Sequence, residues 1–422
     1  MNSSVAKSSA YTLLANVLLA SSHWLLFVII AKFYSGLELG KFVLALSFIS
    51  PAFLFASFKL RTLIVVDRQW QFSLNEYFSA RLLANAIVTL GCILFVVYQW
   101  KELMQVVTIV LLYRWCDSLT EFAHSYQRRL QYFNRIAVLM AGRSLTTMLV
   151  VTVVAINGGT FINLLASWAL TASVFCFFDL WLLRSSSGEN ESQALSIAKF
   201  ISYGSLVRAL ALYKQYFTVA CALIISSLFV YLPNFFLNQQ MGVESAGYFA
   251  SISYFLVAGG IIVNSLSQVL TPKLAIYYQR REQKAFSRLL RQLCLIGLLL
   301  GLFGVGIAWI LGGFFLELFY TPYIAQFHGV LTLLMLAAGV RYIYIFVGTA
   351  LASIQSFAVQ TKIYACGLSA MALSCYLLIP EYGLYGAAFA MLIATLLECL
   401  LFALSIRPHV SKAFSVTTKV VA

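Results

Sequence analysis

The sequence predicts an all-α polytopic membrane protein of about twelve transmembrane helices, arranged in two six-helix lobes related by a parallel repeat. Three observations predict this fold class. Of the 422 residues, 62% are hydrophobic and 10% are charged, which is less than half the charged fraction of an ordinary soluble domain. The mean hydropathy is +0.90. The apolar residues form continuous runs of about 20 residues, the length that a helix needs to cross a bilayer.

Twelve apolar runs, each bounded by charged or turn-forming residues, are the predicted spans. Pro51 interrupts the second run, which membrane helices tolerate where neighbouring groups satisfy the freed carbonyl. Gly297, Gly301 and Gly304 give the ninth run a surface of small residues, which is typical of close helix packing. The first run is too long for a cleavable signal sequence and is expected to stay in the membrane. The predicted spans are Ser9–Ala31, Leu39–Phe58, Phe78–Tyr98, Leu103–His124, Ile136–Ile156, Thr160–Leu183, Lys214–Leu237, Gly247–Leu270, Leu289–Gly313, Ile324–Ala350, Ala358–Ile379 and Leu384–Ile406.

The basic residues predict how these spans are oriented. With the amino terminus in the cytoplasm, 22 of the 28 lysines and arginines fall in inner loops or at inner helix ends, whereas the outer loops hold only Lys32, Lys41 and Lys101. Cytoplasmic loops of membrane proteins carry this excess of positive charge. We therefore expect both termini in the cytoplasm. The net charge of +14 is a topology signal that also suits anionic lipid headgroups, and it does not favour nucleic-acid binding, which needs a basic patch on a soluble fold.

A serine-rich polar segment at the midpoint divides the chain into halves of six spans each. It covers residues 184–208 and separates a predicted amino-terminal lobe, residues 1–183, from a carboxy-terminal lobe, residues 209–422. Short motifs recur in the same order in both halves, for example Glu38 before the second span and Glu244 before the eighth. Because six spans is an even number, we expect the halves to share one orientation, as in transporters built from parallel repeats. Such transporters bind their substrate between the halves, near the membrane midplane.

Several charged residues lie deep inside predicted spans, where an unpaired charge is costly and usually functional. Arg114, Asp117 and Glu121 lie at positions i, i+3 and i+7 of the fourth span, on one helix face. That face must line a watery cavity or contact a polar partner, although Arg114 and Asp117 could also simply neutralise each other. Arg341, the counterpart of Arg114 in the second half, has no acid within a helical turn. It therefore needs a partner on another helix or a bound anion.

Other ionisable groups in the spans have structural interpretations beside the functional ones. Arg143 is expected to reach the inner membrane surface with its long side chain. His23 is expected to form an interhelical hydrogen bond, and Asp179, close to Arg184, to be a residue at the inner boundary of its helix. Glu398, near the middle of the twelfth span, is a candidate carrier of a coupling proton.

The sequence contains no pattern typical of an enzyme or of a cofactor site. The eight cysteines fall almost entirely inside spans without paired spacing, so we expect small buried hydrophobic residues and neither disulfides nor a metal site. We find no phosphate-binding loop and no nucleophile–base pair. The outer loops are very short, for example residues 157–159 and 380–382, whereas a membrane glycosyltransferase or polymerase needs a long outer loop. We therefore expect no enzymatic activity and no cofactor.

Three segments and the layout of six plus six spans resemble those of one family. The run Gln268–Leu274 with Tyr277–Tyr278 after it, the end of the fourth span at Tyr126–Arg129 and the start of the twelfth at Tyr382–Ala388 are similar to segments of polysaccharide flippases of the O-antigen (Wzx) type. These flippases belong to the multidrug/oligosaccharidyl-lipid/polysaccharide exporter superfamily. The likeness covers nearly the entire chain. The peptidoglycan-precursor flippases of the same superfamily typically carry two further spans, which this chain lacks.

The resemblance implies that the substrate is an undecaprenyl-diphosphate-linked oligosaccharide, moved by alternating access to the outer leaflet for O-antigen or other surface polysaccharide. A lipid diphosphate needs positive charge in a cavity, and the planar arginine fork binds two phosphate oxygens at once. A proton or a sodium ion would drive the movement through buried acids. From depth and charge alone, the candidate residues are Arg341, Arg114, Arg143 and Arg61 for substrate binding, and Asp117, Glu121 and Glu398 for ion coupling.

The resemblance also implies a location in the bacterial inner (cytoplasmic) membrane, with a polysaccharide polymerase and a chain-length regulator as partners. The alternative function is ion-coupled export of small amphipathic, multidrug-type substrates. An exporter of cations needs cavity acids that are not paired with arginine. The excess of arginine over free carboxylate at membrane depth therefore favours the flippase.

Overall fold

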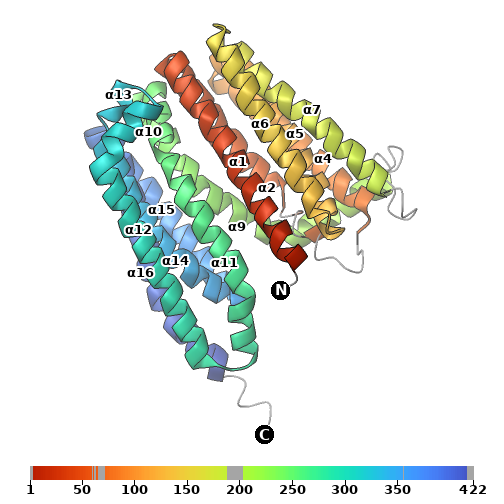
Figure 1. Ribbon diagram of the computed structural model, residues 1–422, viewed down its shortest axis with the longest axis vertical. Coiled ribbons are helices and arrows are strands. Elements are labelled where there is room, and N and C mark those ends of the chain that lie inside the picture. Colours follow the sequence, from red (N-terminus) through yellow and green to blue (C-terminus); the bar gives the residue numbers. More distant parts are fainter. Residues whose placement is uncertain are drawn as a thin grey trace. The chain divides into compact units, whose positions relative to one another are not determined.

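The computed structural model describes residues 3–58, 60, 63–64, 72–187, 203–354 and 356–415, and these residues are helical apart from short turns. Each of the twelve predicted spans lies mostly within one helix, except that the eighth covers parts of α10 and α11 and the tenth begins in α13 and continues in α14 (Figure 1). The elements are α1 (Ser3–Phe33), α2 (Gly36–Ala56), α4 (Leu74–Gln99), η1 (Lys101–Leu103), α5 (Met104–Arg129), α6 (Phe133–Ile156), α7 (Phe161–Ser187), α9 (Tyr203–Met241), α10 (Val243–Ser253), α11 (Phe255–Gln279), α12 (Gln283–Phe319), α13 (Pro322–Ala325), α14 (His328–Ser353), α15 (Phe357–Tyr382) and α16 (Leu384–Ser415).

Local sequence signals set where helices begin. Ser35 and Glu38 form a capping box at the start of α2, and Ser73 and Glu76 form a second one at the start of α4. In each box the serine hydroxyl accepts from a backbone N–H and the glutamate accepts from the backbone of the serine, which satisfies donors that a helix start leaves open. Within α2 the helix continues through Pro51.

Within the described residues, nine helices are long and apolar enough to cross a membrane by themselves, and the bent pair α10–α11 makes ten. The chain is therefore a multi-pass membrane protein. Helix α5 is outside this count because Arg114, Asp117 and Glu121 lie along its middle. It nevertheless packs among α2, α4 and α7, so its polar side chains contact other helices of the bundle.

The eighth predicted span consists of two helices with a bend between them. Helix α10 ends at Ser253, α11 begins at Phe255, and the axis bends by 42° in this region. Gly259 and Gly260 follow the break. Glycine weakens a helix, and a side chain at Gly259 would collide with the ring of Tyr342. The interruption thus lies where α11 approaches α14.

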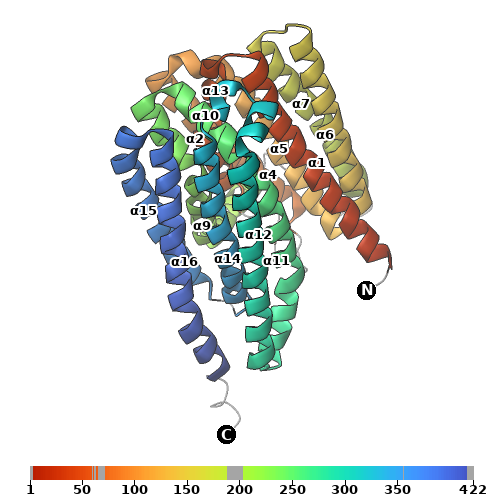
Figure 2. The same ribbon diagram turned by 60° about the vertical axis from the view of Figure 1, so that its left-hand side comes forward.

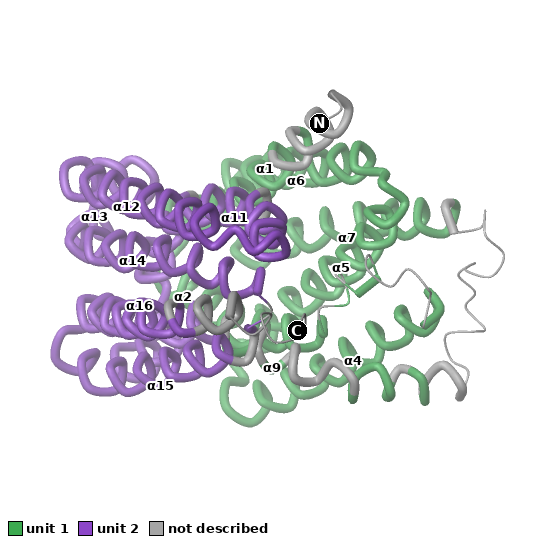
Figure 3. Tube along the Cα trace, turned by 90° about the horizontal axis from the view of Figure 1, so that it is seen from below, with its two compact units in different colours: residues 1–227 green, residues 228–422 purple. Residues whose placement is uncertain are grey.

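The chain divides into two compact units, residues 1–227 and 228–422, with the boundary inside α9 (Figure 3). Each unit is described by itself below. Of the predicted linker, residues 184–187 form the end of α7 and residues 203–208 the start of α9. Residues 188–202 lie outside the described part of the chain, and the predicted lobe boundaries stay a prediction.

Helices at corresponding positions of the two halves pack in the same way. Helix α5 packs against α2, α4 and α7, and α14 packs against α11, α12 and α16. Figure 2 shows α12, α14 and α16 side by side. Each half thus has one central helix that packs against three helices at corresponding positions of its half, as a parallel repeat predicts.

Glycines hold α12 close to α14, as their spacing in the sequence predicts. A Cβ atom added to Gly301 would lie 2.5 Å from the Cα of Gly339, and one added to Gly297 would lie 2.9 Å from the carbonyl oxygen of Tyr342. Such distances leave no room for a side chain, so the two backbones are in direct contact. This packing fixes the helix that carries Arg341.

Candidate functional site

The polar face of α5 meets charged and polar groups from several other helices of unit 1. Arg114 donates a hydrogen bond of 2.5 Å to the hydroxyl of Ser50 on α2. Its guanidinium also lies 3.6 Å from Asp117, one turn along the same helix. The intrahelical pair that the sequence suggested is therefore present.

Asp117 forms a second and shorter ion pair with Arg143 of α6, at 3.1 Å. Arg143 is 6% exposed, so the prediction that it reaches the inner membrane surface is wrong. A guanidinium excluded from water needs a charged partner, and the carboxylate of Asp117 supplies it. Arg114 and Arg143 thus share one acid, and both face the ring of Tyr113, at 5.9 Å and 5.3 Å.

Glu121 pairs with Arg81 of α4 at 2.5 Å. Arg81 is buried and also donates to the backbone oxygen of Ser118 at 3.2 Å. Arg81 is one of the 22 basic residues assigned to inner loops or inner helix ends from the sequence, and its pair with Glu121 was not predicted. The two residues are far apart in the sequence and lie on separate helices, so no local sequence pattern could have predicted their ion pair.

His124 and Asp179 form a third buried pair, between α5 and α7. The ring nitrogen Nε2 of His124 lies 2.9 Å from Oδ1 of Asp179, and both residues are buried. Asp179 is 1% exposed, so its interpretation as a boundary residue close to Arg184 is wrong. His124 continues the polar face of α5 one turn beyond Glu121.

The structure confirms the interhelical hydrogen bond that was predicted for His23. Its Nε2 lies 2.7 Å from the hydroxyl of Tyr113, which is an interhelical hydrogen bond between α1 and α5. The ring of Tyr113 stacks on Trp168 of α7, with ring centroids 3.6 Å apart. These contacts hold Tyr113 in position beneath the two guanidinium groups.

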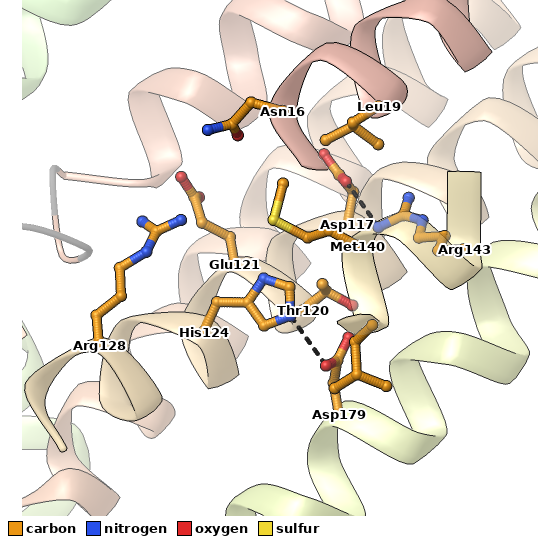
Figure 4. A pocket seen from close by; sticks show the side chains of 11 residues that line it. Asn16, Leu19, Asp117, Thr120, Glu121, His124, Arg128, Met140, Arg143 and Asp179 are labelled. Atoms are coloured by element: carbon orange, nitrogen blue, oxygen red, sulfur yellow. Dashed lines mark hydrogen bonds and ion pairs between the residues drawn. The ribbon is translucent and has the colours of Figure 1, made fainter. Parts of the chain in front are cut away.

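A polar cavity of about 200 Å³ lies among α1, α5, α6 and α7 (Figure 4). Figure 4 shows Asn16 and Leu19 of α1 at one side of the cavity and Asp179 of α7 at the opposite side. The cavity is lined by Asn16, Leu19, Asp117, Thr120, Glu121, His124, Arg128, Leu139, Met140, Arg143 and Asp179. Two predicted coupling acids and one predicted substrate arginine therefore come together, and Arg114 adjoins them through Asp117.

Arg341 of α14 lies in unit 2, in a different setting. Its guanidinium stacks over the ring of Phe229 of α9, at 5.4 Å. In the described part of unit 2, no carboxylate lies within ion-pair distance of Arg341. The described residues of the neighbouring helices thus do not supply the acid that Arg341 lacks on its own helix.

Glu398 of α16 is 1% exposed and lies close to the side chain of Tyr344 of α14. Its carboxylate presses so closely on Gly367 of α15 that a side chain there would collide with it. Arg61, the remaining predicted substrate residue, lies outside the described residues.

The fold is shared with solved transporters. An inward-facing multidrug resistance MATE family transporter of the MOP superfamily has a TM-score of 0.74, with 11% identity over 96% of both chains. The inward closed lipid II flippase MurJ has a TM-score of 0.73, with 14% identity over 96% of this chain and 89% of its own. This chain has the fold of the MOP superfamily. The resemblance found in the sequence is confirmed at the level of fold.

One curated relative is similar over nearly the whole chain. The capsular polysaccharide biosynthesis protein CapF of Staphylococcus aureus is 27% identical over 394 residues, which cover 92% of this chain and 96% of CapF. No protein-family model matches the chain. In this chain, the central helix of each half carries an arginine, Arg114 on α5 and Arg341 on α14.

Proposed function

We propose that the protein is a non-enzymatic flippase that moves undecaprenyl-diphosphate-linked oligosaccharide repeat units from the cytoplasmic to the outer leaflet by alternating access. The membrane is the bacterial inner membrane, with both termini in the cytoplasm. The product serves O-antigen, capsule or another surface polysaccharide. The similarity to MurJ, a lipid II flippase, and to CapF, a capsular polysaccharide biosynthesis protein, supports this proposal.

The observation that carries the proposal is the setting of Arg341. A membrane-depth arginine without a carboxylate partner is expensive unless it serves a ligand or a conformational change. A lipid diphosphate supplies two adjacent anionic groups, and the guanidinium fork binds such oxygens in a bidentate manner. Arg341 is therefore the principal diphosphate-binding residue in this proposal. Arg114 and Arg143 share Asp117 and contribute less positive charge.

Glu398 is the proposed site of the coupling proton. It is buried, with no ion pair in the described part of unit 2. A carboxyl in such a position can gain and lose a proton without first breaking a salt bridge. Asp117 and Glu121 each hold an arginine, so their protonation would also release that partner.

The test is complementation of a deletion in the host. The deleted gene is replaced by the wild type, Arg341→Ala, Arg341→Lys or Arg114→Ala at matched membrane levels, and surface polysaccharide and internal lipid-linked repeat units are measured. Because charge-assisted hydrogen bonds to phosphate contribute about 1.5–3 kcal/mol, we expect Arg341→Ala to lower surface polysaccharide at least about tenfold, with repeat units trapped inside. Arg341→Lys should restore part of the activity because it keeps the charge without the fork.

Arg288→Ala is the matched control because Arg288 is an exposed arginine of α12 in the same unit. It should complement as well as the wild type. The proposal fails if deletion leaves surface polysaccharide intact and instead sensitises the cells to cationic drugs. That result would establish the multidrug exporter.

A polysaccharide polymerase and a chain-length regulator are the proposed partners in the same assembly.

A further inference from the structure

The cavity of unit 1 carries no excess of positive charge. Three acids line it, Asp117, Glu121 and Asp179, together with two arginines and His124. The acids are already engaged, at 3.1 Å with Arg143, at 2.5 Å with Arg81 and at 2.9 Å with His124. A diphosphate in the cavity would lie against these three carboxylates, which outnumber the two arginines of the lining. The cavity therefore does not suit the anionic end of a lipid-linked substrate.

Hydrogen-bonding capacity remains in the cavity even though its charges are paired. The Nη2 atom of Arg143 and the Oγ1 atom of Thr120 are buried without a hydrogen-bond partner. The two residues are 6% and 5% exposed, and both line the cavity. Buried polar atoms in native proteins almost always have a partner. These two atoms thus indicate that the cavity receives a polar guest.

The chemistry of the lining fits a neutral polyhydroxyl compound. A hydroxyl group both donates and accepts, so it can accept from Nη2 of Arg143 while it donates to a carboxylate oxygen of Asp117 or Asp179. Thr120 and the amide of Asn16 can serve either role. Planar polar groups around the cavity thus offer donors and acceptors in several directions, as in Figure 4.

We propose that the cavity among α1, α5, α6 and α7 binds one sugar residue of the transported lipid-linked glycan through its hydroxyl groups. This inference rests on the proposed function and deepens it, because it names the residues of unit 1 that would recognise the sugar. It makes the cavity the part of the protein that distinguishes one glycan from another. Recognition by hydrogen bonds suits this task, since a missing hydroxyl leaves a buried polar group unpaired.

The test compares two lipids on the same purified protein in nanodiscs. The probes are undecaprenyl diphosphate and the undecaprenyl-diphosphate-linked repeat unit extracted from the host, and their dissociation constants are measured by native mass spectrometry. We expect the wild type to bind the glycosylated lipid at least about tenfold more tightly, the gain of more than one net hydrogen bond. The nearly isosteric Thr120→Val should weaken binding of the glycosylated lipid about fivefold and leave binding of the bare lipid unchanged.

Thr108→Val is the matched control, because Thr108 is an exposed threonine of the same helix whose hydroxyl bonds to the backbone of Met104. It should change neither constant. Asn16→Ala is a second test variant with an exposed side chain, and it should reproduce the selective loss if Thr120→Val does not fold. Thermal unfolding of each variant in the same nanodiscs identifies any that are misfolded.

Three results would overturn the inference in distinguishable ways. Equal binding of both lipids by the wild type would mean that the sugar is not recognised, while the flippase function stands. An equal loss for both lipids in Thr120→Val would assign the cavity to the diphosphate-bearing part that the two lipids share. Failure of the wild type to bind either lipid, together with failed complementation, would remove the proposed function itself.

Discussion

Arg143, with its side chain buried between helices, shows how this fold accommodates a charge inside the bundle. The guanidinium lies 3.1 Å from Asp117 and 5.3 Å from the ring centre of Tyr113. Arg114 approaches the same carboxylate and the same ring. The carboxylate and the face of the aromatic ring both attract cations, and together they offset the cost of removing two guanidinium groups from water.

Neutralising Asp117 should therefore destabilise unit 1. Asp117→Asn leaves Arg114 and Arg143 as neighbouring cations without an acid, and breaking a buried pair in this way costs about 3–5 kcal/mol. The double variant Asp117→Asn, Arg143→Met should recover part of this loss because it removes the buried charge as well. Thermal unfolding of the purified proteins in detergent measures both. A double variant that loses the full sum of the two single effects would contradict the network.

At the scale of helices, α12 and α14 depend on the absence of side chains at their contact. A methyl group at Gly301 would lie 2.5 Å from the Cα of Gly339, whereas one at Gly306, further along the same helix, would have nothing within 4 Å. The two glycines thus make a matched pair within one element.

Gly301→Ala and Gly306→Ala should change stability in opposite directions. Gly301→Ala forces α12 away from α14, and overpacking of this kind costs about 1–3 kcal/mol. Gly306→Ala meets open space, and alanine is favoured over glycine in a helix by up to about 1 kcal/mol. The melting temperature should fall for the first variant and stay level or rise for the second. An unchanged melting temperature for Gly301→Ala would show that the helices do not meet there.

The helices were predictable from the sequence, and so was the polar face of α5, because both depend on local periodicity. The glycine contact of α12 was predictable for the same reason. The residues that pair with the polar face of α5 were not predictable. Arg81 and Asp179 each lie near a helix end in the sequence, and only the packing of α4 and α7 against α5 brings them to Glu121 and His124.

The break between α10 and α11 was missed because the apolar run continues through it. Hydropathy records how apolar a segment is and contains no information on its direction. Gly259 becomes significant only through its contact with Tyr342 of α14. The partner of a glycine, like that of a buried charge, is a tertiary property.

At the scale of the whole molecule, the number of membrane crossings depends on α5. Within the described residues, nine or ten helices qualify as spans by composition alone, and α5 does not qualify because of its charges. It lies in unit 1 against α2, α4 and α7. Its central place in the unit predicts that it crosses the membrane, with its charges turned to other helices and to the cavity.

Reporter fusions test this crossing. A fusion after Gln131, between α5 and α6, should place the reporter in the cytoplasm, and one after Asn157, between α6 and α7, should place it outside. Alkaline phosphatase is active only outside and green fluorescent protein fluoresces only inside, so the two reporters should give opposite patterns. The same reporter pattern at both positions would contradict the predicted topology.

The most direct measurement of the central claim is transport of a lipid-linked glycan by the purified protein. Proteoliposomes are loaded with undecaprenyl-diphosphate-linked repeat units in both leaflets, and the fraction that an added glycan-cleaving enzyme reaches is followed with time. With the wild type, the account predicts that this fraction rises beyond the outer-leaflet share, whereas Arg341→Ala stays at the level of protein-free vesicles. Wild-type vesicles that behave like protein-free vesicles while they transport a cationic dye would contradict it.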